Sequence, residues 1–194
     1  MFTRRITSFI LSFAIALSLF AQGTPKYVFY FIGDGMGVNQ VNGTETYLAA
    51  LEGRIGVKPL LFTSFPAVGL ATTFSATNGV TDSAAAGTAL ATGEKTKNGA
   101  IGVLADQKTP VSSIATWAKD AGAAVGVATS VSVDHATPAA FYAHVGGRDS
   151  YYTIGKHLIA ANFDFYSHFF GNSVSSHNSF GTVMTAVFTH LFGE

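Results

Sequence analysis

The sequence contains no cysteine, and only 11% of its residues are charged. The missing cysteines exclude disulfide bonds, thiolate zinc sites and a cysteine nucleophile, so any metal would be bound by carboxylate, imidazole, hydroxyl or water. The formal net charge is zero and the basic residues are scattered, so nothing favours nucleic acid as a partner. The hydrophobic share of 48% excludes a disordered chain. A length of 194 residues suits one domain of ordinary size.

The first segment of the chain, residues 1–23, is typical of a signal peptide. Basic residues near the start precede an uncharged apolar run at 6–20. The small residues Ala21 and Gly23 are spaced for cleavage by signal peptidase, and the cut could follow either of them. A retained anchor helix is the alternative, although the run is short for a bilayer span. We therefore expect an exported, periplasmic or extracellular protein with no membrane attachment after cleavage.

Apolar runs alternate with helical patterns between residues 24 and 166. The patterns predict strands at 26–33, 68–74, 124–131 and 163–166, and helices at 38–51, 83–92, 109–121, 137–144 and 150–161. Strands that alternate with helices predict an α/β fold with a mainly parallel sheet and helices on both of its faces.

The tail, residues 167–194, differs in character from the rest of the chain. Its first half mixes Ser, Asn, His and Phe without a clear period. Apolar residues between 183 and 191 could form one stripe of a helix. We treat the tail as a divergent segment of uncertain structure.

Three polar segments follow the predicted strands. Asp34 follows the first strand, Asp82 and Ser83 follow a loop after the second, and 134–137 follows the third. Ligands of α/β proteins bind beyond the carboxyl ends of the strands, so we expect these segments to converge. Asp34 lies between two glycines, where a carboxylate suits a hard or borderline cation. A plain Asp-Gly turn is the alternative.

Ser83 begins a predicted helix of small residues. Free N–H groups and the positive end of the helix dipole favour an anion at this position. A serine hydroxyl attacks only after a base or a metal removes its proton. The sequence has no G-x-S-x-G elbow, so a metal is the better candidate for the activator. The alternative role for Ser83 is a helix N-cap.

Three further residues are candidates for the same site. Thr137 precedes a proline and could be an N-cap, or its hydroxyl could face a cation. His135 could bind a metal, support a metal ligand or be an ordinary loop histidine. Arg148 follows two glycines and could bind phosphate through two parallel hydrogen bonds, or it could be a solvated surface arginine.

Five blocks of the sequence share their order and spacing with one known family. They are YVFYFIGDGMG at 27–37, TDSAAAGTALATG at 81–93, KTKNGAIG at 95–102, HATPAAFYAH at 135–144, and Arg148. With these blocks the chain resembles the alkaline phosphatase family over residues 26–166. The resemblance implies hydrolysis of small phosphate monoesters. It also implies that Ser83 attacks phosphorus and forms a phosphoserine intermediate, that Arg148 binds two phosphoryl oxygens, and that Asp82 orients this arginine.

The same resemblance implies a metal site with two Zn²⁺ ions and one Mg²⁺ ion. By this likeness Asp34 bridges a zinc and the magnesium, and Thr137 is a magnesium ligand. His135 stands where some members carry Asp and others His, a choice that tunes the third metal site. Members of the family are often homodimers.

The departures from the family pattern are as informative as the matches. Family members are more than twice as long, and their second half supplies most of the metal ligands, none of which is recognisable here. Asp164 and His168 have the spacing of a zinc pair, but they lie at the wrong place in the chain order, so we interpret them as coincidental. We therefore expect an incomplete chain, for which a frameshift or a premature stop is one hypothesis. The alternatives are an inactive fragment that binds phosphate or metal weakly, and a phosphodiesterase-like or sulfatase-like member of the wider superfamily.

Overall fold

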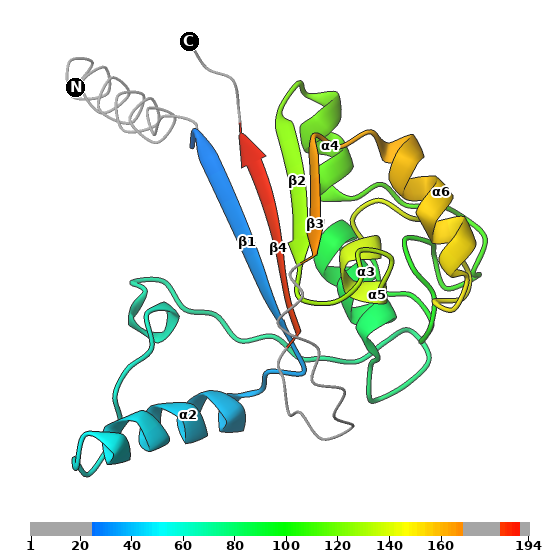
Figure 1. Ribbon diagram of the computed structural model, residues 1–194. Helices are drawn as coiled ribbons and strands as arrows, with labels where there is room; N and C mark the ends of the chain where they lie inside the picture. Colours follow the sequence, from blue (N-terminus) through cyan, green and yellow to red (C-terminus); the bar gives the residue numbers. More distant parts are fainter. Residues whose placement is uncertain (1–24, 169–182, 191–194) are drawn as a thin grey trace, which may run out of the picture.

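The computed structural model describes residues 25–168 and 183–190. The predicted signal peptide at 1–23 lies outside these residues, as does most of the tail. The elements in chain order are β1 (Tyr27–Asp34), α2 (Val38–Leu51), the 3-10 turn η1 (Phe62–Ser64), α3 (Ser83–Thr92), α4 (Ile114–Asp120), β2 (Ala124–Thr129), α5 (Ala136–Ala139), α6 (Tyr151–Ala161), β3 (Phe165–His168) and β4 (Val183–His190) (Figure 1). In the described part of the chain, no helix is both long and apolar enough to cross a membrane.

The sheet has four strands in the order β1-β4-β2-β3. Strand β4 runs antiparallel to both β1 and β2, and β3 runs parallel to β2. Strands β1, β2 and β3 therefore all point in one direction, which confirms the predicted α/β class with a mainly parallel sheet. The helical interpretation of residues 183–191 is wrong, because 183–190 form β4. This segment carries a β-branched residue at every second position, a pattern that favours a strand.

The hydrophobic core lies where helices α3 to α6 gather beside β2 and β3 (Figure 1). Val125 and Val127 of β2 are buried, together with Phe141 from the segment after α5 and Ile154 from α6. Tyr30 of β1 meets the Phe141 ring edge-on, with 6.2 Å between the ring centroids. This contact ties the middle of β1, the strand that ends at Asp34, to the helical part of the molecule.

A long segment between β1 and α3 projects away from this core (Figure 1). Its helix α2 buries only Ala49. The Glu45 carboxylate of α2 accepts hydrogen bonds from the Leu60 backbone N–H and the Thr63 hydroxyl, so the part of this segment that carries α2 and η1 is tied to itself. The predicted strand at 68–74 is wrong: these residues have no regular secondary structure. A short apolar run needs a neighbouring strand to pair with, and sequence pattern alone cannot supply one.

Two helices begin at other residues than the Thr-Pro pairs suggest. The helix expected at 109 begins at Ile114, because the Ser113 hydroxyl caps it by accepting the Thr116 N–H at 3.1 Å. The short helix α5 begins at Ala136 with His135 in the N-cap position. Thr137 is thus inside the helix, and its hydroxyl is available for another contact.

Candidate active site

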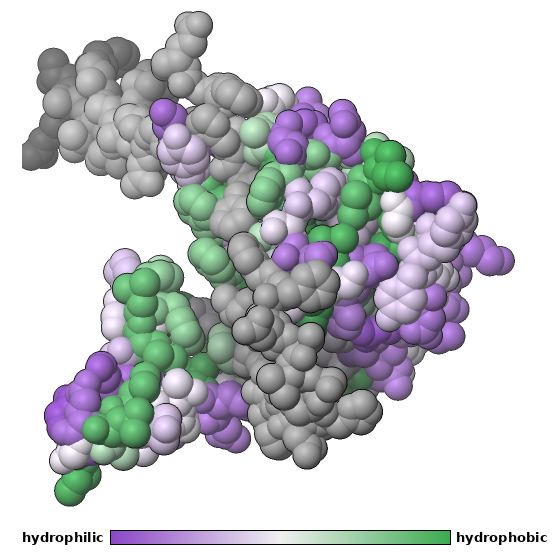
Figure 2. Space-filling model, in the orientation of Figure 1, coloured by the Kyte–Doolittle hydropathy of each residue, from purple (hydrophilic) through white to green (hydrophobic). Residues whose placement is uncertain are grey.

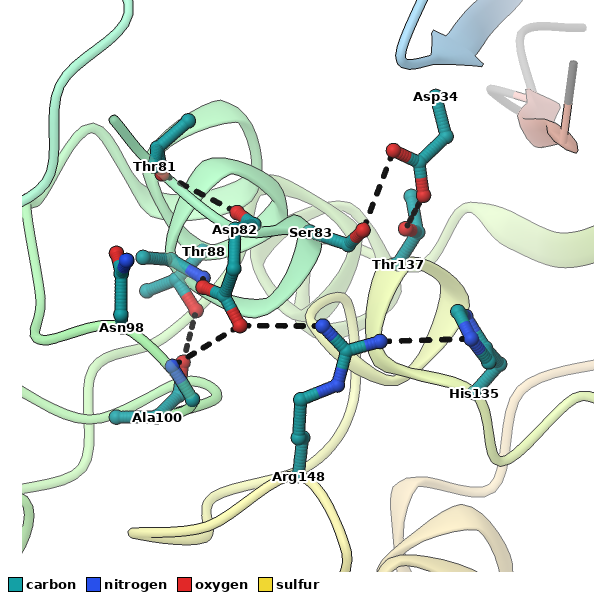
Figure 3. A network of polar contacts seen from close by, with 12 residues as sticks. Asp34, Thr81, Asp82, Ser83, Thr88, Asn98, Ala100, His135, Thr137 and Arg148 are labelled. Carbon is teal, nitrogen blue, oxygen red and sulfur yellow. Dashed lines mark hydrogen bonds and ion pairs between the residues drawn. The ribbon is translucent and has the colours of Figure 1, made fainter.

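The start of α3 places Ser83 on the edge of a cleft. Asp82 is the N-cap of this helix, and its Oδ1 accepts the Ala85 N–H at 3.0 Å. The capping role that the sequence left open for Ser83 therefore belongs to Asp82. The Ser83 hydroxyl instead points across to β1 and donates to Asp34 Oδ1 at 3.2 Å (Figure 3).

Asp34 accepts hydrogen bonds from the hydroxyl groups of two different helices. Its Oδ2 accepts a hydrogen bond from Thr137 Oγ1 at 3.0 Å, while its Oδ1 faces Ser83. Thr137 lies 103 positions away in the sequence and is only 3% exposed. Gly35, with φ of +69°, makes the turn that ends β1 directly after the carboxylate. The carboxylate and the two hydroxyls form one compact cluster of oxygen atoms.

Small residues allow α3 and α5 to approach closely enough to build this cluster. A Cβ atom at Gly87 would lie 3.1 Å from Ala140 Cβ and 3.5 Å from Thr137 Cα. Such a contact would force the two helices apart. The small side chains of α3 therefore bring Thr137 to the same carboxylate as Ser83.

Asp82 and Arg148 form a second polar pair beside the first cluster. Asp82 Oδ2 accepts from Arg148 Nη1 at 3.1 Å and from the Gly99 N–H at 3.1 Å. The two side chains are 26% and 27% exposed, so Arg148 is not a solvated surface arginine. Burial favours the neutral form of Asp82, but hydrogen bonds from Ala85, Gly99 and Arg148 outweigh it and lower its pKa below 3.8. Asp82 is therefore an ionised partner that orients the guanidinium.

His135 lies on the other side of Arg148. Its Nε2 is 3.4 Å from Arg148 Nη2, and its Nδ1 is buried without a hydrogen-bond partner in the described part of the chain. Burial, followed by the positive charge of Arg148, lowers the pKa of His135 below 6.5 despite the opposing charges of Asp34 and Asp134. An arginine only donates, so Nε2 accepts in this contact and the imidazole is neutral.

Five of the six candidate side chains border a cleft with a volume of about 520 Å³, and His135 is not part of its lining. Asp34, Asp82, Ser83, Thr137 and Arg148 line it, with Ile32, Met36 and Leu90 among its apolar residues. Residues from β1, α3, α5 and the segment after α5 thus meet at one place. The predicted convergence holds even though the predicted second strand does not exist.

The residues present form only part of a metal site. The oxygen atoms of Asp34, Ser83 and Thr137 are ligands of the kind that Mg²⁺ prefers. Among residues 25–168 and 183–190, no three His, Asp, Glu or Cys side chains converge on one point. Asp164, the first member of the apparent zinc pair, binds Lys119 at 2.8 Å through both of its oxygens. The oxygen cluster fits one hard cation, and the described residues do not make up a two-zinc centre.

The sequence reasoning missed Gly99 as a site residue. Its N–H fixes the carboxylate of Asp82, and its φ of +86° requires glycine at this turn. The Asn-Gly pair at 98–99 is a turn signal that could have suggested a special backbone position. Side-chain chemistry alone gives no such indication.

Comparison with known proteins places these residues in one family. The family model described as alkaline phosphatase matches residues 25–164. The tissue-nonspecific alkaline phosphatase of Gallus gallus is 40% identical over 148 residues, which are 71% of this chain and 28% of that protein. The isozyme of Homo sapiens is 38% identical over 151 residues, or 73% of this chain and 29% of that protein. The chain therefore spans less than a third of the length of these relatives.

Solved structures give the same likeness. The cold-active alkaline phosphatase of a psychrophilic Shewanella species superposes with a TM-score of 0.62 and 36% identity over 69% of this chain and 33% of that one. The alkaline phosphatase of the Antarctic bacterium TAB5 superposes with a TM-score of 0.57 and 34% sequence identity, over 70% of this chain and 37% of that one. A variant of the TAB5 enzyme, in which a histidine is replaced by aspartate, has magnesium bound in a site called M3. It superposes with a TM-score of 0.55 and 36% sequence identity, over 62% of this chain and 34% of that one.

Proposed function

Because the chain belongs to the alkaline phosphatase family, we propose that its cleft is the nucleophile and phosphate-binding part of a phosphomonoesterase site. One observation carries the proposal. The hydroxyl of Ser83, at the first turn of α3, and the guanidinium of Arg148 border the same cleft, and each is oriented by its own carboxylate. A nucleophile and a cation that face one small cleft suit a tetrahedral dianion.

Ser83 acts as the nucleophile in this proposal. Its Oγ forms a bond to phosphorus while the bond from phosphorus to the leaving oxygen breaks, and the leaving alcohol takes up a proton. Water then cleaves the phosphoserine, releases inorganic phosphate and restores the serine. Asp34, which accepts the Ser83 hydrogen bond, holds Oγ toward the cleft before attack.

Arg148 and the start of α3 bind the phosphoryl oxygens. The guanidinium can present two parallel N–H groups to two oxygens of the substrate. Asp82 keeps it in place through one Nη atom, at 3.1 Å. The positive end of the α3 helix dipole adds partial positive charge on the side of Ser83.

The metal ions of the family would be supported here by Asp34 and Thr137. A bound divalent cation lowers the pKa of a coordinated hydroxyl and stabilises a leaving alkoxide. We propose Mg²⁺ at the oxygen cluster, with His135 tuning this site, and two Zn²⁺ ions in the complete family site, for which the described residues supply only part of the ligands. The TAB5 variant that carries aspartate in place of a histidine and magnesium in its M3 site supports a tuning role of this kind.

An inactive fragment that binds phosphate or metal weakly is the second candidate. Two observations favour it: the chain spans 28% of the length of a relative such as the chicken isozyme, and no three metal-binding side chains of the named types converge among the described residues. Serine activation needs a metal, so incomplete ligation would leave a cleft that binds without turnover. The Ser83 and Arg148 pair favours a monoesterase over a phosphodiesterase-like or sulfatase-like enzyme.

The remaining parts of the proposal concern the setting of the protein. We propose a small phosphate monoester as the substrate, and export to the periplasm or the extracellular space through cleavage after Ala21 or Gly23. A homodimer is proposed from the family resemblance alone. The boundaries 1–23, 24–166 and 167–194 stay predictions about its organisation.

The purified chain with added Zn²⁺ and Mg²⁺ tests this function on a chromogenic aryl phosphate at alkaline pH. Turnover that a chelator abolishes and that Ser83→Ala reduces to the buffer rate would support the enzyme. Ser150→Ala is a matched control, because Ser150 is the N-cap residue of α6 and makes no side-chain capping bond. Mass spectrometry after acid quenching should find phosphate on Ser83. Rates equal to buffer, with measurable phosphate binding, would support the inactive fragment instead.

A further inference from the structure

The backbone that leads to Arg148 is paired at Val145 and has open space beside Gly147, whose carbonyl accepts the Ser150 N–H at 3.2 Å. Val145 exchanges two backbone hydrogen bonds with Ile101, each at 2.9 Å. A Cβ atom at Gly147 would meet nothing within 4 Å, so the chain has open space beside it. Between these two positions, the Gly146 carbonyl accepts a hydrogen bond from Gln107 Nε2 at 3.2 Å. Within residues 25–168 and 183–190, this is the last side-chain hydrogen bond to the backbone before Arg148.

Gln107 adopts an unusual conformation to make this contact. Its φ of +62° lies in the left-handed region, where residues other than glycine are uncommon. A turn enforces it: Gln107 N–H bonds to Leu104 O at 2.9 Å, and Leu104 N–H bonds to Thr109 O at 2.8 Å. Lys97 Nζ also donates to Gln107 Oε1 at 3.2 Å, which leaves the amide N–H₂ for Gly146.

The two backbones touch at this point. A Cβ atom at Gly146 would lie 2.9 Å from the Gln107 carbonyl oxygen and 3.3 Å from its Cβ. Glycine at 146 is therefore required by the close approach of the turn that carries Gln107. Backbone strain in one segment and an excluded side chain in the other indicate a contact that the fold maintains.

We propose that Gln107 is a positioning residue for Arg148, through its hydrogen bond to the Gly146 carbonyl. Gly146 lies two residues before Arg148, whose guanidinium must reach Asp82 at 3.1 Å and His135 at 3.4 Å. Releasing Gly146 frees the backbone at 146–148, so holding the guanidinium toward the cleft then costs conformational entropy. The inference rests on the proposed function, because it assumes that Arg148 binds phosphate.

Two substitutions remove the amide donor in different ways. Gln107→Gly accepts φ of +62° without strain and keeps the turn, and Gln107→Glu keeps the size and the Lys97 contact but has no N–H to donate. Titration calorimetry with inorganic phosphate should show affinity reduced about fivefold in each, as expected when binding must also order about one more backbone residue. Lys97→Met, which leaves the bond to Gly146, should change affinity by less than about twofold. Equal affinity in all four proteins would overturn the proposal.

A double-mutant cycle separates positioning from general stability. In an Arg148→Ala background, Gln107→Gly should cause no further loss of phosphate affinity, because the residue that it positions is gone. Two losses that simply add would show that Gln107 acts elsewhere and would overturn the proposal. Where turnover is measurable, Gln107→Gly should raise KM in the Arg148 protein and leave KM unchanged in the Arg148→Ala protein.

The two glycines provide a matched pair. Gly146→Ala places a methyl group against the Gln107 carbonyl and should weaken phosphate binding, whereas Gly147→Ala meets no neighbour and should have a smaller effect. An equal loss in both would indicate that glycine flexibility matters rather than the contact with Gln107.

Hydrogen exchange keeps the inference separate from the proposed function. Amides at 146–149 should exchange faster in Gln107→Gly than in the unaltered chain, with or without phosphate. If the unaltered chain binds no phosphate, the proposed function fails and the exchange rates still decide whether Gln107 restrains this backbone. Unchanged exchange at 146–149 would overturn the inference even if the cleft binds phosphate.

Discussion

At the scale of single residues, the site depends on side chains that are far apart in sequence and share one partner. The Ser83 and Thr137 hydroxyls approach different oxygens of Asp34. Each oxygen of this carboxylate therefore orients one hydroxyl, and a change in either hydroxyl alters the whole cluster.

Thr137→Val tests this sharing, because valine has nearly the same shape and no hydroxyl. We expect unfolding free energy to fall by about 1 kcal/mol, the usual value of one hydrogen bond, as measured by denaturant titration. Binding of Mg²⁺, followed by calorimetry, should weaken because one oxygen ligand is lost. If both quantities match those of the unaltered chain, Thr137 has no part in the cluster.

Asp82 links site geometry to the pH dependence of stability. Its pKa in the folded chain lies below 3.8, so the folded state keeps the charge where the unfolded chain has begun to take up a proton. This contribution is present above pH 3.8 and is lost as pH falls through the lower folded value. In Asp82→Asn, which still caps α3, the fall of stability below pH 3.8 should be shallower. Thermal unfolding between pH 5 and pH 2.5 measures the difference, and identical slopes would contradict the role of Asp82.

At the scale of elements, the distance between α3 and α5 decides whether the cluster forms. Gly87 is the point of closest approach, with a hypothetical Cβ 3.1 Å from Ala140 Cβ. Gly87→Val should destabilise the chain by about 1–3 kcal/mol, the usual effect of overpacking, and should weaken phosphate binding by moving Thr137. Gly155→Ala in α6 is the control: its Cβ meets no neighbour, and we expect a gain of about 0.5–1 kcal/mol from helix propensity. Equal behaviour of the two variants in denaturant titration would contradict this account.

A histidine of α6 contacts the segment that follows α5, and it accepts a hydrogen bond there only while its imidazole is neutral. His157 Nδ1 accepts the His144 backbone N–H at 3.1 Å. Burial, then the neighbouring His144 and Lys156, lowers the pKa of His157 below 6.5. The unfolded chain therefore binds the proton first, and stability should decrease as pH falls through 6.5. His157→Gln can accept the same hydrogen bond without titrating, so its stability should change less between pH 7.5 and pH 5.5. Thermal unfolding of both proteins at these pH values measures the difference. An equal loss of stability in the unaltered chain and in His157→Gln would refute the role of His157.

The sequence predicted elements well where local signals were strong and failed where tertiary contacts decide. Helices α2 and α3 have the predicted bounds, because Gly37 and Asp82 precede them and Gly93 ends α3. The predicted start of α4 at the Thr-Pro pair is wrong because Ser113 caps the helix instead. The predicted strand at 68–74 is wrong because an apolar run does not reveal whether a strand can pair.

The motif residues predicted the side chains of the site, but this prediction lacked the backbone contacts that hold them. Asp34, Asp82, Ser83, Thr137 and Arg148 line one cleft, whereas the sixth candidate, His135, is not part of its lining. The restraints from Gly99 and Gln107 were not predicted, because backbone hydrogen bonds and positive φ angles are set by the path of the chain and not by side-chain chemistry.

At the scale of the whole molecule, apolar surface is concentrated on the segment between β1 and α3, residues 38–80. Figure 2 shows this hydrophobic surface along the projection that carries α2. Leu51, Leu61 and Leu70 are 65%, 81% and 95% exposed. All three lie inside the part of the chain that matches the family model, yet the chain spans less than a third of its relatives' length.

Exposed apolar side chains of this number favour association at high concentration. We expect the unaltered chain to self-associate in sedimentation velocity as concentration rises, and the triple variant Leu51→Gln, Leu61→Gln, Leu70→Gln to do so less. These side chains bury little area, so the midpoint of thermal unfolding should stay within about 2 °C of the unaltered value. Ile154→Gln provides the contrast, because Ile154 is fully buried in the core and its replacement should lower the midpoint strongly. A triple variant that loses stability as Ile154→Gln does would show that the segment 38–80 packs as tightly as the core.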